Sequence, residues 1–189
     1  GIFEVKCNDG NTFNIKSKNL INSAGTSSET VSESIEALAK KYILPIRYAK
    51  GHYYKYTGEH PFNSLVYPIS DEFTSGLHVG FDVSGQIRFG PSLSWVDNID
   101  FIFDESLKEY FIRSIQKYWP DLNPDKLHPD YVGIRPKIQN INEQMKDFSI
   151  LYAKDHGVSG LVNIQGIESP GITSCLSIGR HVTDLIIKN

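Results

Sequence analysis

The sequence predicts an α+β fold with a mainly antiparallel or mixed β-sheet and flanking helices. Short β-type runs fill the middle of the chain and are separated by glycine, proline and serine. Near each end, at residues 19–42 and 160–187, a strand-like run leads through a turn of small residues into a helix-like run. We therefore expect an antiparallel sheet in the middle and a small amount of βα character at both ends.

The first third of the chain predicts a hairpin, a strand and a helix. Residues 2–6 and 12–16 alternate apolar and polar side chains around an Asn-Asp-Gly-Asn turn. A short apolar strand follows at residues 19–22. Thr26 and Glu29 have the spacing of a capping box, and apolar residues then recur at helical intervals as far as Tyr42.

The remaining elements are predicted from the same two periodicities. A helix with Asp104 as its N-cap should run to Trp119, where Pro120 ends it. Four prolines between residues 120 and 136 predict a loop with little regular structure there. A closing helix is expected at residues 172–187. Strands are expected at residues 53–56, 65–69, 77–83, 86–89, 148–153 and 160–164.

Composition excludes several classes of protein. The 189 residues include 19 basic and 22 acidic side chains, with a formal net charge of −3. Because no basic stripe is present, we expect no nucleic-acid partner. The two cysteines, Cys7 and Cys175, are too far apart in sequence to predict a disulfide framework or a zinc knuckle, and no His-x-x-x-His pair occurs, so no metal site is predicted. No apolar run approaches the roughly 18 residues of a transmembrane segment. We expect a cytoplasmic protein.

Three common enzyme signatures are missing from the sequence. No Gly-x-Gly-x-x-Gly turn and no Gly-Lys-Ser/Thr of a P-loop occurs. Ser169 does not fit a hydrolase nucleophile elbow, because the residue after it is Pro170, whose nitrogen cannot donate to an oxyanion.

The segment at residues 161–174 has the chemistry to hold a planar, electron-accepting ligand. An apolar strand leads into a turn bounded by Gly166 and Gly171, and then into a helix. Glycine allows the backbone to approach a ligand closely, and the free N–H groups at the start of a helix favour negative charge, such as a flavin gains on reduction. The alternative interpretation is an ordinary strand-to-helix turn.

Several segments in order resemble the carboxy-terminal half of FAD-dependent oxidoreductases of the D-amino-acid oxidase superfamily, and more narrowly L-2-hydroxyglutarate dehydrogenases and oxidases. Together the matching pieces cover almost all of the chain, and those at residues 131–137 and 166–173 are the most distinctive. The pieces are Asn-Leu-Ile-Asn-Ser-Ala-Gly at 19–25, Lys-Gly-His-Tyr-Tyr at 50–54, Leu-Val-Tyr-Pro-Ile at 65–69, Gly-Leu-His at 76–78 leading to Phe-Gly-Pro at 89–91, Tyr-Val-Gly-Ile-Arg-Pro-Lys at 131–137 and Gly-Ile-Glu-Ser-Pro-Gly-Ile-Thr at 166–173.

The resemblance implies a role for each matching position. It implies a small 2-hydroxy acid, such as L-2-hydroxyglutarate, as substrate, with Arg135 holding its carboxylate and His78 taking its hydroxyl proton. Lys137 and Lys50 are candidates for a second substrate carboxylate, and Tyr53, Tyr54 and Tyr67 for the core or the pocket wall, with Tyr54 and Tyr67 chosen as substrate contacts. The implied FAD contacts are Ser23, Ala24, Gly25, Gly166, Ile167, Glu168, Ser169, Pro170, Gly171, Ile172 and Thr173.

The resemblance also implies a division of the chain and a missing part. Residues 1–41 should return to the FAD domain, residues 42–153 should form the β-rich substrate domain, and residues 154–189 should supply the strand, turn and helix at the flavin. The chain starts at Gly1, its one methionine is Met145, and the Gly-x-Gly-x-x-Gly grip on FAD is absent. We therefore expect a part of a longer, Rossmann-like flavoenzyme whose amino-terminal βαβ half is supplied in cis or in trans.

Three functions remain open at this point. The first is a portion of an FAD-dependent 2-hydroxy-acid oxidoreductase that is inactive alone, and peripheral to the inner membrane if its electron acceptor is there. The second is a non-catalytic remnant or binding module that lacks FAD. The third is an amine oxidase of the D-amino-acid or glycine oxidase type.

Overall fold

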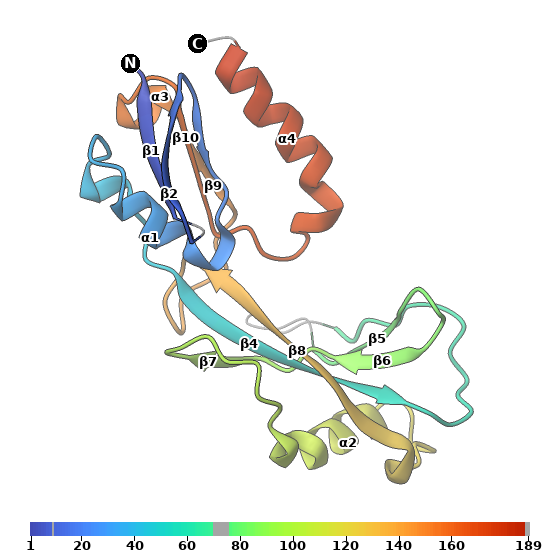
Figure 1. The fold of residues 1–189 in the computed structure, drawn as a ribbon. Helices are drawn as coiled ribbons and strands as arrows, with labels where there is room; N and C mark the ends of the chain where they lie inside the picture. The colour runs from blue at the N-terminus through green and yellow to red at the C-terminus, as the bar shows by residue number, and fades with distance from the viewer. Residues whose placement is uncertain (9, 70–75, 188–189) are drawn as a thin grey trace. The chain divides into compact units, whose positions relative to one another are not determined.

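The computed structural model of the chain describes residues 1–8, 10–69 and 76–187. The chain forms two compact units (Figure 1): one comprises Gly1–Arg47, Pro136–Gln139 and Lys146–Asn189, and the other Tyr48–Arg135 and Asn140–Met145. We call them unit 1 and unit 2. These boundaries lie at other residues than the expected ones after 41 and 153, and two of them, after Arg47 and after Arg135, fall inside the strands Arg47–Tyr56 and Leu127–Lys137.

Unit 1 contains a hairpin and a three-stranded sheet. Strands β1 (Phe3–Asn8) and β2 (Thr12–Ser17) form the expected antiparallel hairpin. In the sheet, β10 (Leu161–Gln165) lies between β3 (Leu20–Asn22), to which it is parallel, and β9 (Ser149–Leu151), to which it is antiparallel. The terminal segments with βα character thus meet as neighbouring parallel strands.

Helices cover the unit 1 sheet. Val162 and Ile164 of β10 pack with Val182 of α4, whereas Leu161 packs with Ile35 and Leu38, which follow α1. Both faces of β10 are therefore buried, as is typical of a parallel strand. The helical segments of this unit are 3-10 turns at Gly25–Ser27 and Lys40–Tyr42 and α-helices α1 (Ser28–Glu33), α3 (Ala153–His156) and α4 (Gly171–Ile187).

Unit 2 is built around one long strand. Strand β4 (Arg47–Tyr56) pairs near its amino-terminal end with β7 (Ser94–Val96) and near its carboxyl end with β6 (Ile87–Gly90). Strand β6 also pairs with β5 (His78–Phe81). The long strand β8 (Leu127–Lys137) also pairs with β4. Antiparallel neighbours dominate the unit, as expected.

The core of unit 2 lies on one face of this sheet. Helix α2 (Lys108–Gln116) places Phe111 and Ile115 in a cluster with buried sheet residues that include Tyr54 and Phe89. Asp104 begins this helical segment as predicted, since its carboxylate accepts the Ser106 N–H at 3.0 Å. Short 3-10 turns at Glu105–Leu107 and Pro124–Lys126 complete the unit.

Two sequence expectations were wrong. Residues 127–137 form a strand, although Pro129 and Pro136 predicted a loop; among the described residues β8 pairs only with β4, so its prolines do not interrupt an interior ladder. Helix α1 ends at Glu33 and has no side-chain cap, because the Glu29 carboxylate accepts the Ile46 N–H at 2.7 Å instead of closing a capping box.

Smaller differences concern the strands. The run at 65–69 forms only an isolated bridge between Val66 and Val79, and β4 begins well before the expected strand at 53–56. None of the described helices is both long and apolar enough to cross a membrane.

Candidate functional site

The predicted cofactor-contacting residues gather at one edge of the unit 1 sheet. Ser23 and Gly25 follow the carboxyl end of β3, and Ile167 and Gly171 follow the carboxyl end of the parallel strand β10. All four line one pocket of about 490 Å³, whose remaining lining is mainly apolar. Ligands of open α/β sheets bind at the carboxyl ends of parallel strands. Two segments far apart in sequence therefore form one candidate cofactor site.

The first of these segments is held by a buried amide. The Asn22 Oδ1 accepts the Ala24 N–H at 3.2 Å, and the Asn22 amide donates to the Asn163 Oδ1 at 2.8 Å. Gly25 has a φ of +58° and open space where a side chain would be. The backbone of this turn is therefore fixed, and the space at Gly25 is open.

The second segment, the 166–171 turn, is held by a contact with Ile138 and by a hydrogen bond within the turn. Gly166 has a φ of +75°, and a Cβ there would lie 2.9 Å from the Ile138 side chain. The Gly171 N–H donates to the Glu168 carbonyl at 2.5 Å and closes the turn. Helix α4 starts at Gly171, so Ile172 and Thr173 lie in its first turn, and the Ile172 side chain is exposed. The turn is bent through Ser169 and Pro170, which are joined by a cis peptide bond.

Lys137 and Glu168, both predicted site residues, contact each other. The Lys137 Nζ lies 2.5 Å from the Glu168 Oε1, and the two side chains are only 5% and 6% exposed. The positive charge of Lys137 is thus paired with a carboxylate of the 166–171 turn, within unit 1.

In unit 2 the functional candidates occupy the face of the sheet opposite α2. His78 pairs with Gly90, and the register of β6 on β4 places Tyr53 next in that row. A Cβ on Gly90 would lie 2.8 Å from the Tyr53 ring, so only glycine allows this ring to lie across β6. We call this surface the open face.

His78 has a specific environment on the open face. The Tyr67 ring stacks on it with centroids 4.5 Å apart and planes 17° apart. Burial and the nearby positive charge of Arg135 hold the pKa of His78 below its ordinary value of 6.5. The imidazole is therefore neutral near pH 7, and a neutral imidazole can accept a proton. Three predicted site residues, His78, Tyr67 and Arg135, are thus brought together.

Two other predicted residues lie elsewhere in unit 2. Tyr54 is fully buried in the core, where its ring packs on Phe103 and Phe111, and burial raises its pKa to about 12. Successive strand residues point to opposite faces, so it is Tyr53 that lies on the open face. Lys50 is buried and forms an ion pair with Asp100. Neither Tyr54 nor Lys50 therefore faces the open face with a free polar group.

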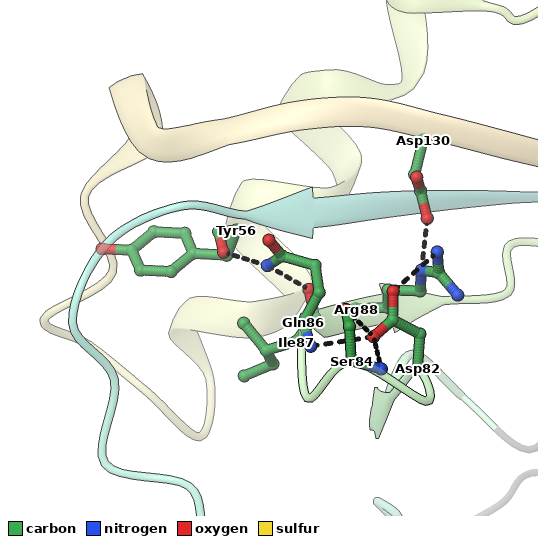
Figure 2. A network of polar contacts seen from close by, with 7 residues as sticks. All are labelled: Tyr56, Asp82, Ser84, Gln86, Ile87, Arg88 and Asp130. Carbon is green, nitrogen blue, oxygen red and sulfur yellow. Dashed lines mark hydrogen bonds and ion pairs between the residues drawn. The ribbon is translucent and has the colours of Figure 1, made fainter.

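Sequence reasoning missed Arg88, which organises part of the open face (Figure 2). Its guanidinium lies 3.2 Å from the Asp82 carboxylate and 2.5 Å from that of Asp130. It also lies over the Tyr131 ring, which stacks on Tyr53 with centroids 4.4 Å apart. Arg88 is two residues before Gly90 on β6, so both lie on the same face of the sheet. This spacing was the signal available in the sequence.

No cluster of metal-ligating side chains occurs among the described residues. The candidate cofactor site combines an apolar pocket, two turns at the strand ends and a helix N-terminus, which are what a planar, electron-accepting ring requires. The residues present therefore fit the ring of a flavin. The sequence has no Gly-x-Gly-x-x-Gly segment for the pyrophosphate.

Comparison with known proteins defines the class. The family model for FAD-dependent oxidoreductases, DAO, matches residues 1–185, and the chain belongs to this family. FAD is the cofactor of the family.

Curated relatives narrow the resemblance. The chain is 36% identical over 181 residues to the mitochondrial L-2-hydroxyglutarate dehydrogenase of Arabidopsis thaliana, covering 89% of this chain and 38% of that protein. It is 21% identical over 210 residues to L-2-hydroxyglutarate dehydrogenase of Salmonella houtenae, covering 91% of this chain and 48% of that protein. The chain thus spans less than half the length of either relative.

Solved structures show the same fold. An FAD-bound L-alpha-glycerophosphate oxidase from Mycoplasma pneumoniae has a TM-score of 0.72 at 22% identity, over 95% of this chain and 45% of that one. Glycine oxidase from Geobacillus kaustophilus has a TM-score of 0.69 at 15% identity, over 96% and 44% of the two chains.

Proposed function

We propose that this chain is the substrate-binding and flavin-contacting portion of an FAD-dependent dehydrogenase that oxidises a 2-hydroxy acid such as L-2-hydroxyglutarate. The observation that carries the proposal is the placement of Arg135 near a neutral, half-buried His78 on the open face of unit 2. The 36% identity to an L-2-hydroxyglutarate dehydrogenase over 181 residues supports the substrate class.

Each side chain has a chemical task in this proposal. The planar guanidinium of Arg135 binds the substrate carboxylate through two parallel hydrogen bonds. The neutral His78 imidazole accepts the proton of the substrate hydroxyl as the carbinol carbon is oxidised. Tyr67, stacked on His78, limits the orientations of the imidazole. A bound FAD would supply the acceptor for the hydride that leaves the carbinol carbon.

Unit 1 would hold the flavin ring at the ends of β3 and β10. Ser23, Gly25, Ile167 and Gly171 line the pocket there, and the N–H groups at the start of α4 favour the negative charge of a reduced flavin. Binding of the pyrophosphate requires a further segment, which we propose is a dinucleotide-binding βαβ half.

The unit 1 surface supports such a second half. Strand β3 pairs on one side with β10, and its outer edge has no strand partner among the described residues. Ile21 on β3 and Ile172 and Leu176 on α4 are 44%, 92% and 86% exposed. A βαβ unit added at this edge would place a parallel strand beside β3, and its helices are the elements that normally cover exposed apolar side chains of this kind, because parallel sheets are covered on both faces.

The test uses the complete enzyme, which we define as this chain together with a dinucleotide-binding half in the same polypeptide or co-expressed. We expect a yellow protein whose flavin is bleached anaerobically by L-2-hydroxyglutarate. A panel that includes glycine and D-amino acids tests the amine oxidase alternative, because an amine substrate releases ammonia. A protein that binds FAD and is bleached by no 2-hydroxy acid would overturn the proposal.

The chain alone provides the second arm of the test. Mixed with FAD, it should bind weakly, because most of the dinucleotide contacts are missing. Tight stoichiometric binding by the chain alone would contradict the division into two halves.

A further inference from the structure

A buried ion pair ties the end of β8 to the 166–171 turn. Lys137 and Glu168 meet at 2.5 Å with both side chains at least nine-tenths buried. Ile138, the next residue, packs over Gly166. One short segment, residues 136–139, therefore contacts the turn twice, through a charge and through an apolar side chain.

The pair has no role in the proposed chemistry as it stands. Lys137 was a sequence candidate for binding a substrate carboxylate, but its ammonium group already contacts the buried Glu168 carboxylate. Removing either partner would leave a buried charge without its counter-ion, which strongly favours the paired geometry. The Glu168 carbonyl also accepts the Gly171 N–H, so fixing Glu168 fixes the backbone that starts α4.

We propose that Lys137 is a positioning residue for the 166–171 turn, acting through Glu168. The ion pair holds the turn in one backbone conformation and places two opposite charges beside the flavin-contacting segment. This inference rests on the proposed function for its flavin readout.

The first experiment needs no flavin. In the chain alone, amide hydrogen exchange of residues 166–172 is compared between the native protein and Lys137→Gln. We expect faster exchange in this segment, and restored protection in Lys137→Arg. Lys50→Gln is the control, because it also removes a buried lysine from an ion pair, but in unit 2, where the partner Asp100 side chain is 41% exposed. Unchanged exchange at residues 166–172 in Lys137→Gln would overturn the proposal.

The second experiment separates positioning from general stabilisation. In the complete enzyme, the flavin reduction potential is measured for Lys137→Gln and for Glu168→Gln. Loss of Lys137 leaves a negative charge near the ring and should lower the potential, whereas loss of Glu168 leaves a positive charge and should raise it. A merely structural role would move both variants in the same direction, and that result would contradict the inference.

The two proposals fail in different ways. The flavin potential is measured by photochemical reduction, which needs no substrate. The effect of the ion pair can therefore be measured even in an enzyme that oxidises no 2-hydroxy acid. We expect FAD affinity to fall by roughly tenfold or more in Lys137→Gln, with near-native affinity in Lys137→Arg and in Lys50→Gln. Equal loss of affinity in Lys50→Gln would show a general folding defect and overturn the assignment to Lys137.

Discussion

At the scale of single residues, His78 shows how burial and a neighbouring charge prepare a side chain for chemistry. Burial is the larger cause of its lowered pKa, and the positive charge of Arg135 adds to it. Both effects disfavour the imidazolium. In the proposed reaction, His78 would therefore remain a competent base at pH values where an ordinary histidine is already protonated.

This environment predicts a pH profile for the complete enzyme. The rate constant kcat/KM for L-2-hydroxyglutarate should fall on the acid side with a midpoint below 6.5, as His78 becomes protonated. His78→Gln should lower kcat by about 10²–10⁴-fold and remove that limb. In the companion variant Arg135→Met, the midpoint of the acid limb should move to higher pH, because the loss of a nearby positive charge raises the pKa of His78. A wild-type limb at or above the ordinary histidine value would contradict the assignment.

Gly160 is a residue whose identity is imposed by close backbone approach. Its φ is +78°, and a Cβ there would lie 2.3 Å from the Lys18 carbonyl oxygen. Its own carbonyl accepts the Leu20 N–H at 2.9 Å, where β3 begins beside β10. The backbone at this point has no room to move away from an added side chain.

We expect Gly160→Ala to destabilise unit 1 by at least about 1–3 kcal/mol, from the left-handed φ alone. Gly179→Ala is the control, because this helical glycine has open space at its Cβ and alanine favours a helix by about 1 kcal/mol. Urea unfolding of the chain measures both. Equal stability of the two variants would contradict the reasoning.

At the scale of elements, a buried amide network specifies how β3 and β10 pair. Asn163 accepts from the Asn22 amide at 2.8 Å and from the Ser32 hydroxyl at 2.9 Å. Gln165, on the same side of β10, donates to the Leu44 carbonyl at 2.8 Å and accepts the Leu44 N–H at 3.0 Å. The Gln165 amide thus pairs with Leu44 as a neighbouring strand would.

Breaking this network should be costly. Asn163→Ala removes the partner of two buried groups, and we expect a loss of about 2–4 kcal/mol in the free energy of unfolding. Asn14→Ala serves as the control, since its bond to Glu4 is exposed. Chemical denaturation of the chain provides the measurement. A cost below that of the control would show that water replaces the lost bonds.

The elements also show which sequence signals could be trusted. The hairpin of β1 and β2, the N-cap at Asp104 and the closing helix were predicted because each depends on local periodicity or turn chemistry. Strand β8 was missed because proline content indicates a loop unless the strand's position in the sheet is known. The capping box predicted from Thr26 and Glu29 was wrong because the Glu29 carboxylate accepts the N–H of Ile46, a residue beyond the helix.

At the scale of the whole molecule, three histidines make stability depend on pH: His52 and His156 are buried and His78 is half-buried. Burial is the largest cause of the lowered pKa of His52, His78 and His156. The unfolded chain binds protons at each of them near 6.5, before the folded protein does. The free energy of unfolding is therefore greatest above this value and falls as the pH decreases toward the folded pKa values.

Thermal unfolding at pH 7.5 and 5.5 tests this directly. The Tm should be lower at pH 5.5, with His52 and His78 acting in unit 2 and His156 in unit 1. Replacing His52 by Gln should weaken the dependence in unit 2. An equal Tm at both pH values would contradict the three pKa directions.

The sequence by itself determined the α+β class, the flavoenzyme family and the segments that carry the candidate site. Those segments were visible because glycines, the motif at residues 131–137 and strand periodicity are local properties of the chain. The position of His78 in its strand was available from the same signals.

Only the tertiary structure decided which of these residues act together. Tyr53 and Tyr54, adjacent in sequence, lie on opposite faces of β4 because successive strand residues alternate, and the register was set by β6. Lys137 and Lys50 were equivalent cations in sequence, yet each is a buried lysine that forms an ion pair with a carboxylate far along the chain. Such long-range pairing depends on packing, which no local pattern records.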